Sequence, residues 1–272
     1  MCPIQMPFCL VESKEAYSDL WAKVYIIATN AKDKDGACFM RTLLIIPAYN
    51  EEESLEATIR SIELTSGDAD FLIVNDGSKD GTAEVCRRNG YPFLDLPVNL
   101  GLAGAFQAGM KYAYRHGYDC AIQFDADGQH LPEYISTLEK AIMHADIVIG
   151  SRFVNEKKPK SMRMLGSNLI QGAIKLTTGK TIKDPTSGMR AFNSRMIELM
   201  ARGLNCGPEP DTVSYLIKRA NAEVVEVPVK MAERFAGESY LNVWTSAKYM
   251  LRMSISILFM QFVRKRIGGE AK

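Results

Sequence analysis

Residues 120–127 read CAIQFDAD, an apolar run that ends in Asp125 and Asp127, two carboxylates one residue apart. The run predicts a short buried strand, so that both carboxylates stand at its exit. Mg²⁺ and Mn²⁺ prefer oxygen ligands and keep part of their coordination shell for substrate phosphates, so two carboxylates at this spacing can share one such cation. The stretch therefore indicates a metal and diphosphate site. A solvated surface turn is the alternative.

Two earlier segments have the same construction. The apolar run Leu43–Ile46 ends in PAYNE at 47–51, and the run Phe71–Val74 ends in NDGSKDGT at 75–82. Short β-rich runs that break into turn residues are typical of parallel strands buried on both faces. Ligands of open α/β sheets bind outside the carboxyl ends of such strands. We therefore expect Tyr49, Asp76 and the Asp125–Asp127 pair to line one crevice.

Six segments, in this order, resemble glycosyltransferase family 2, and most closely its dolichol-phosphate mannosyltransferase and polyprenyl-phosphate glycosyltransferase branch. These segments are 47–51, 74–82, 99–101, 125–130, 150–152 and 184–190, and the likeness runs from about Arg41 to Tyr240. The resemblance implies an α/β protein with the GT-A fold, in which helices flank a mostly parallel central sheet. It also implies a nucleotide-sugar donor, a divalent metal (Mg²⁺ or Mn²⁺) and inversion at the anomeric carbon.

The resemblance also implies roles for individual residues. The residues expected to bind the donor are Pro47, Tyr49, Glu51, Asp76, Asp125 and Arg234, and those expected at the metal are Asp125, Asp127 and Gln129. The residues expected to contact the acceptor phosphate are Arg152, Arg163 and Ser167, and the catalytic set is Asp127, Arg152 and Asp184. Gly188 and Arg190 are expected to shape the acceptor side. Ordinary loop charge is the alternative for each arginine, since Lys157, Lys158 and Lys160 lie nearby. A calcium-binding EF-hand loop is excluded, because its sixth position needs Gly and holds His130 here.

The acceptor decides whether a catalytic base is needed. A polyprenyl phosphate is already anionic and can attack the anomeric carbon without losing a proton, whereas a sugar hydroxyl needs a carboxylate base, for which Asp184 is the one candidate. We expect transfer of a hexose from a nucleotide sugar to polyprenyl phosphate at the cytoplasmic membrane face. The alternatives are transfer to a hydroxyl of a lipid-linked cell-envelope glycan and a non-catalytic nucleotide-sugar-binding protein.

Composition limits the class of protein. The 272 residues are 47% hydrophobic, which is enough for one α/β domain of about 200 residues with appendages. A net charge of +1 excludes a globally basic nucleic-acid binder. The six cysteines show no C-x-x-C spacing and are typical of reduced thiols in a cytoplasmic protein.

The expected division of the chain is an N-terminal extension at 1–39, the glycosyltransferase domain at 40–240 and a C-terminal segment at 241–272. Residues 1–39 are either an added helix or sequence upstream of a true start at Met40, and we favour the second. The pattern predicts helices at 51–65 from an Asn50–Glu53 capping box, after a cap at Asp80, at 102–117, and at 131–143, 162–177, 193–203 and 209–221. It predicts further strands near 146–150 and 223–229.

The segment Val243–Val263 reads as a mostly apolar helix followed by Arg264-Lys265-Arg266. Its longest uncharged run, Met253–Val263, has 11 residues, fewer than the roughly 20 that span a bilayer. We predict an amphipathic helix that lies in the membrane interface, where Lys248 and Arg252 meet anionic lipid. The alternatives are a helix packed on the domain and a helix that pairs two chains in a homodimer. We expect a protein peripherally bound to the inner face of the membrane.

Overall fold

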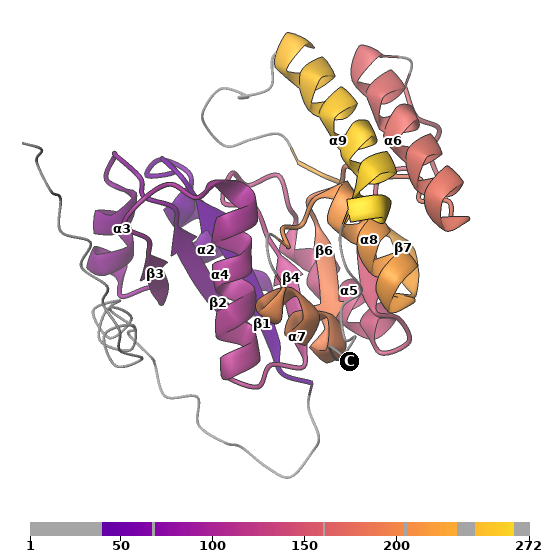
Figure 1. The fold of residues 1–272 in the computed structure, drawn as a ribbon. Helices are drawn as coiled ribbons and strands as arrows, with labels where there is room; N and C mark the ends of the chain where they lie inside the picture. The colour runs from indigo at the N-terminus through magenta and orange to yellow at the C-terminus, as the bar shows by residue number, and fades with distance from the viewer. Residues whose placement is uncertain (1–39, 67–68, 160, 204–205, 233–242, 264–272) are drawn as a thin grey trace, which may run out of the picture.

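The computed structural model describes residues 40–66, 69–159, 161–203, 206–232 and 243–263. They form a seven-stranded sheet with the order β3-β2-β1-β4-β6-β5-β7 (Figure 1). The strands are β1 (Thr42–Ala48), β2 (Asp70–Asn75), β3 (Phe93–Asp95), β4 (Cys120–Gln123), β5 (Ile147–Ser151), β6 (Arg190–Asn193) and β7 (Val224–Pro228). All neighbours are parallel except β6, which runs antiparallel to both β4 and β5. The predicted mostly parallel sheet is confirmed.

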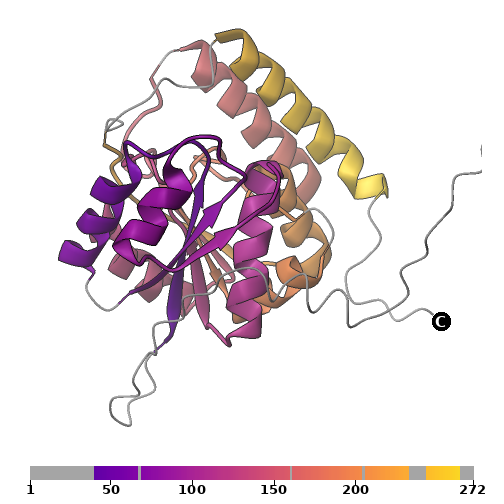
Figure 2. The same cartoon turned by 90° about the vertical axis from the view of Figure 1, so that its left-hand side faces the viewer.

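Helices cover both faces of this sheet (Figures 1 and 2). The helices are α2 (Leu55–Thr65), α3 (Thr82–Asn89), α4 (Gly101–Arg115), the 3₁₀ turn η1 (Pro132–Tyr134), α5 (Ile135–Ile142), α6 (Met162–Thr178), α7 (Ser194–Arg202), α8 (Pro210–Ala220) and α9 (Val243–Val263). Strand β1 shows how the core divides. Its Leu43 and Ile45 pack with α4, α7 and α8, whereas Leu44 and Ile46 pack with α2, α3 and α5. Successive side chains of a strand point to opposite faces, so a continuous apolar run suits a strand buried on both.

The helix predicted at 51–65 begins four residues later, at Leu55, and its predicted capping box is wrong. Asn50 adopts a left-handed conformation with φ of 57°, which takes it out of the N-cap geometry. Its side-chain oxygen accepts a hydrogen bond from the Lys79 N–H at 2.9 Å instead. Ser54 then stands at the N-cap. The Asn50 side chain thus braces two loops at the carboxyl edge of the sheet.

The other predicted helices and strands are found within a few residues of their expected bounds, but β3 and β6 were not predicted. Strand β6 has four residues and begins with Arg190, a charged side chain that is fully buried. A short run that opens on a charge carries no apolar signature. Its place between β4 and β5 is set by tertiary pairing.

Helix α9 lies alongside α6, as both views show (Figures 1 and 2). Its Met250, Met253 and Ile257 are buried in the core, and Ser256 donates a hydrogen bond of 2.6 Å to Asp211 on α8. A Cβ on Gly166 of α6 would lie 2.5 Å from Met250 Cγ, so this glycine permits the close approach of the two helices. The alternative of a helix packed on the domain is therefore confirmed for this face.

The side of α9 that faces away from the core exposes apolar and basic residues together. They do not separate into one apolar and one polar face, so the amphipathic helix stays a prediction. Among the described residues, no helix is both long enough and apolar enough to cross a membrane. Residues 1–39 and Arg264-Lys265-Arg266 lie outside the described residues, as does the predicted domain boundary between 240 and 241.

Gly109 of α4 tests the packing between helix and sheet. A Cβ at this position would lie 2.4 Å from Ile45 Cγ2 on β1, so Gly109→Ala should lower the free energy of unfolding by about 1 to 3 kcal/mol despite the better helix propensity of Ala. Gly172→Ala on α6 is the matched control, since no atom lies within 4 Å of its added Cβ. It should be neutral or stabilising by up to about 1 kcal/mol. Urea unfolding measures both, and equal stabilities would contradict the packing described here.

Candidate active site

Three strand ends meet at one edge of the sheet. Ala48 of β1 pairs with Asn75 of β2, and Ile45 of β1 pairs with Gln123 of β4. Because these strands are parallel, the residues that follow them emerge at the same edge. The predicted grouping of Tyr49, Asp76 and the Asp125–Asp127 pair is therefore seen at the level of the backbone.

On the β1 and β2 side, side chains hold the loops in place. The Asp76 carboxylate is 3% exposed and accepts a hydrogen bond of 2.7 Å from the Leu100 N–H, which fixes the segment before α4. The Glu51 N–H donates to Thr82 Oγ1 at 2.9 Å, and the Glu51 carboxylate accepts from Ser54 Oγ. Pro47 and Tyr49 are half-buried beside these loops. Contacts of these residues with a donor nucleotide stay predictions.

On the β4 side, a tight turn at 125–130, which we call the acidic turn, presents the two carboxylates. Asp127 is 4% exposed, and its Oδ1 accepts a hydrogen bond of 3.0 Å from the Gln129 N–H. The Asp125 side chain is 33% exposed, so it is the more accessible of the pair. His130 is buried behind them, where its Nδ1 accepts a hydrogen bond of 2.9 Å from the Asp125 N–H and its Nε2 lies 3.4 Å from Asp125 Oδ2.

His130 was not predicted as a site residue. Its position in sequence, three residues after Asp127, was the one sign that it could belong to the site. Its edge-on contact with Phe124 fixes the orientation of the imidazole ring. The imidazole therefore orients Asp125 from the protein side.

The donor set of the acidic turn fits a hard divalent cation. Carboxylate oxygens are the ligands that Mg²⁺ and Mn²⁺ prefer. Within the described ranges there is no group of three or more His, Cys, Asp or Glu residues that could hold a metal without other ligands. A cation held by Asp125 and Asp127 would thus take further oxygens from a substrate diphosphate or water. The Gln129 side chain as a third ligand stays a prediction.

Strand β6 brings a second segment, 184–188, to the acidic turn. Arg190, the first residue of β6, pairs with Gln123 at the end of β4, so the residues before it lie at the carboxyl edge. A Cβ on Gly188 would lie 2.8 Å from Asp125 Oδ2 and 3.1 Å from His130 Nε2. Only a residue without a side chain lets the segment pass this close.

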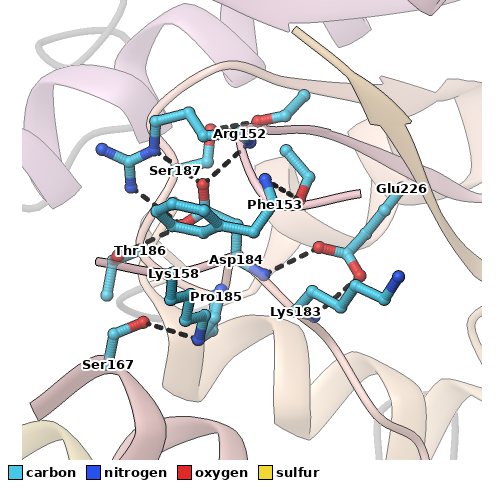
Figure 3. Close-up of polar contacts among 12 residues, drawn as sticks. Arg152, Phe153, Lys158, Ser167, Lys183, Asp184, Pro185, Thr186, Ser187 and Glu226 are labelled. Atoms are coloured by element: carbon cyan, nitrogen blue, oxygen red, sulfur yellow. Dashed lines mark hydrogen bonds and ion pairs between the residues drawn. The ribbon is translucent and has the colours of Figure 1, made fainter. Parts of the chain in front are cut away.

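Arg152, the residue after β5, forms a bidentate ion pair with Asp184 of this segment (Figure 3). Arg152 Nε donates to Asp184 Oδ2 at 2.7 Å, Arg152 Nη2 donates to Oδ1 at 2.8 Å, and the Arg152 N–H donates to Oδ2 at 3.1 Å. Asp184 is fully buried, whereas the Arg152 side chain is 26% exposed. Both carboxylate oxygens are thus engaged, and the pair presents a guanidinium to the solvent side.

Arg190 stabilises the segment 184–188 from the protein interior. Its guanidinium is fully buried and donates hydrogen bonds to the carbonyl oxygens of Pro185 and Pro208. Burial lowers the pKa of Arg190, while nearby Glu209, Asp184 and Asp125 favour its charged form. Burial also raises the pKa of the Glu209 carboxyl. Arg190 therefore shapes the segment without reaching its surface, and the role expected of it on the acceptor side stays a prediction.

The remaining predicted residues of the acceptor and donor sites are only partly placed. Ser167 on α6 is fully buried, and its Oγ lies 3.3 Å from Lys158 Nζ. Arg234 lies outside the described residues, and the side chain of Arg163 is not described. The chain that precedes Arg234 lies beside the acidic turn, since the Ala232 N–H donates to the Gln129 carbonyl at 3.0 Å.

The sequence is similar to that of known glycosyltransferases. Residues 43–199 match the model of Glycosyl transferase family 2. An undecaprenyl-phosphate mannosyltransferase of Micrococcus luteus is 34% identical over 218 residues, which cover 75% of this chain and 88% of that protein. A polyprenol monophosphomannose synthase of Mycolicibacterium smegmatis is 30% identical, covering 74% of this chain and 81% of that protein. A dolichol-phosphate mannosyltransferase of Pyrococcus furiosus is 34% identical, covering 78% of this chain and 62% of that protein.

Solved structures share the fold. Glucosyl-3-phosphoglycerate synthase from Mycobacterium tuberculosis, in complex with Mn²⁺, uridine diphosphate and phosphoglyceric acid, aligns with a TM-score of 0.60 at 18% identity. The alignment covers 82% of this chain and 78% of that one. The similarity extends to the mixed sheet with helices on both faces, which is the GT-A fold that the motifs predicted. The chain thus belongs to glycosyl transferase family 2 and is a glycosyltransferase.

Proposed function

We propose that the enzyme transfers a hexose from a nucleotide sugar to a polyprenyl phosphate at the cytoplasmic face of the membrane. The observation that carries this proposal is the Arg152–Asp184 pair, whose Asp184 stands on the segment 184–188 that reaches the acidic turn at Gly188. Asp184 takes the Nε–Nη2 edge of the Arg152 guanidinium and fixes its orientation, and the edge formed by Nη1 and Nη2 can still donate to a phosphate. The names of the relatives from Micrococcus luteus and Pyrococcus furiosus support a polyprenyl-type phosphate as acceptor and make mannose the first sugar to test.

The contacts of Asp184 favour a phosphate acceptor over a sugar hydroxyl. A hydroxyl needs a carboxylate base within reach of its proton. Asp184 is fully buried, and Arg152 engages both of its oxygens, so it suits the orientation of Arg152 better than proton removal. A phosphate oxygen needs no base. It attacks the anomeric carbon as the bond from that carbon to the donor diphosphate breaks, and the nucleoside diphosphate leaves with the electron pair.

On the donor side, Asp125 and Asp127 would hold the divalent cation, and His130 orients Asp125. Such a cation supplies stabilisation of the negative charge on the leaving diphosphate. The Mn²⁺ and uridine diphosphate in the structure of glucosyl-3-phosphoglycerate synthase support this arrangement by analogy. Asp76 fixes the segment before α4 through Leu100 and in this way shapes the nucleotide side.

A surface formed by α6 and α9 supports the membrane location. Apolar side chains that are 38% or more exposed recur at helical spacing on each helix, namely Leu165, Leu169 and Leu176 on α6 and Leu251, Ile255, Leu258 and Phe259 on α9. We call these seven residues the α6–α9 apolar surface. The exposed Lys248 and Arg252 on α9 supply positive charge. Apolar residues flanked by basic ones are typical of helices that lie on anionic lipid.

Asp127 tests the metal assignment. Asp127→Asn should lower kcat by ~10² or more, because the charge that helps to hold the cation is removed while the amide oxygen can still accept the Gln129 N–H. The measurement is single-turnover transfer at saturating donor and Mn²⁺ or Mg²⁺. Removal of divalent metal by EDTA should have a similar effect.

Asp119→Asn is the matched control, since Asp119 accepts a backbone N–H from Arg41 at the opposite end of β4. It should leave kcat unchanged. Activity of Asp127→Asn close to that of the wild type, or full activity of the metal-stripped enzyme, would contradict the assignment.

The α6–α9 apolar surface tests the membrane location. Leu251 is 58% and Phe259 64% exposed, so the double variant Leu251→Gln, Phe259→Gln should fold normally. It should lose binding to vesicles that contain anionic lipid by about tenfold or more, because two apolar side chains no longer insert. Liposome flotation measures the bound fraction, which should also fall as salt rises.

The control is the double variant Leu64→Gln, Met143→Gln, which removes side chains that are 80% and 64% exposed on α2 and after α5. Its vesicle binding should equal that of the wild type. Equal losses in both double variants would mean that binding is a general property of exposed apolar residues, and no binding by the wild type would rule out the membrane location.

A further inference from the structure

Lys158 belongs to the loop after β5, and its side chain reaches the second and third turns of α6. Its Nζ lies 3.3 Å from Ser167 Oγ, 3.0 Å from Asn168 Oδ1 and 3.0 Å from Gln171 Oε1. Figure 3 shows the ammonium next to Ser167 and below Pro185. All three partners are neutral acceptors on α6, so they fix the position of the cation without cancelling its charge.

No carboxylate of the described residues makes an ion pair with Lys158. Burial lowers the pKa of its ammonium group, and Arg152 lowers it further, whereas Asp184 and Glu226 raise it. Lys158 therefore shares the electrostatic environment of the Arg152–Asp184 pair. An anion bound there would favour the charged form of the lysine and relieve the cost of its partial burial.

A shared aromatic ring ties Lys158 to Arg152. Lys158 Nζ lies 5.7 Å from the centre of the Phe153 ring, and Arg152 Cζ lies 5.2 Å from the same centre. Contacts of both cations with one ring fix the loop that carries them. Asp184 meanwhile occupies the Nε and Nη2 edge of Arg152. The loop thus holds two cations, of which one is paired with a carboxylate and the other with neutral groups only.

We propose that Lys158 is the second cation of the acceptor site and binds the phosphate group of a phosphomonoester acceptor together with Arg152. Ser167, Asn168 and Gln171 are positioning residues that hold its ammonium group. This inference rests on the proposed function, because it names the residue by which that site recognises its phosphate. Ser167 is fully buried, so it acts through Lys158 rather than by its own contact with the phosphate.

This arrangement also explains how the site distinguishes a phosphate from an alcohol. A phosphomonoester carries between one and two negative charges near neutral pH and pairs with two cations, whereas an alcohol of the same chain cannot. Lys158 should therefore contribute to binding of the phosphate and contribute nothing to binding of the alcohol. Lys157, the preceding residue, is exposed and supplies the matched control.

The test compares the wild type with Lys158→Gln, Lys158→Arg and Lys157→Gln in the full chain. The probes are farnesyl phosphate and farnesol, whose binding is measured by calorimetry in the presence of a nucleoside diphosphate and Mn²⁺. Lys158→Gln should weaken farnesyl phosphate binding about tenfold or more, because a positive charge held next to the phosphate is lost, and leave farnesol and nucleoside-diphosphate binding unchanged. Lys158→Arg should restore most of the loss, and Lys157→Gln should match the wild type.

Two results would overturn the inference alone. The first is unchanged farnesyl phosphate binding by Lys158→Gln, with wild-type transfer to polyprenyl phosphate intact, which would leave the proposed function standing. The second is an equal loss of farnesyl phosphate, farnesol and nucleoside-diphosphate binding, because Lys158 would then only fasten the loop to α6. A wild type that binds no farnesyl phosphate would contradict both the inference and the proposed acceptor.

Discussion

The reversal of one short strand places the two halves of the site next to each other. Strands β1, β2 and β4 run parallel and deliver Tyr49, Asp76 and the acidic turn to their common carboxyl edge. Strand β6 runs against β4 and β5, so the residues that precede it, rather than those that follow it, lie at this edge. Gly188 thereby meets the acidic turn, and Asp184 lies four residues before it in the same segment. Arg190 anchors the reversal, since its buried guanidinium binds carbonyl oxygens on both sides of β6 in sequence, at Pro185 and Pro208.

The charges of the site follow from this geometry. The acidic turn concentrates two carboxylates where a metal and a diphosphate would meet, with His130 behind Asp125. The neighbouring segment pairs its carboxylate, Asp184, with Arg152. In the proposed function, one side holds a cation bound to the leaving diphosphate and the other receives an anionic acceptor. Such a division needs little acid or base chemistry, because positioning and charge stabilisation supply most of the catalysis of a phosphate attack.

The sequence predicted the parts of the molecule that depend on local pattern. Apolar runs such as Leu43–Ile46 predicted buried parallel strands, and helices such as α6 and α8 were found close to their expected bounds. Tertiary contacts decided the rest. Asn50 does not cap a helix, because its side chain accepts a hydrogen bond from the loop after β2. Strand β6 begins with the buried, charged Arg190. In sequence Lys158 is ordinary loop charge, and only the fold brings it to three neutral partners on α6. None of these contacts leaves a periodic signal in the chain.

The most direct measurement of the central claim compares two acceptors that differ only in a phosphate group. The enzyme is incubated with a panel of labelled nucleotide sugars and either polyprenyl phosphate or the polyprenol of the same length, and label in the lipid extract is counted. We expect that one nucleotide sugar labels polyprenyl phosphate, that mild acid releases the sugar, and that polyprenol stays unlabelled. Equal labelling of polyprenol, or no labelling of polyprenyl phosphate by any nucleotide sugar, would contradict the proposed acceptor.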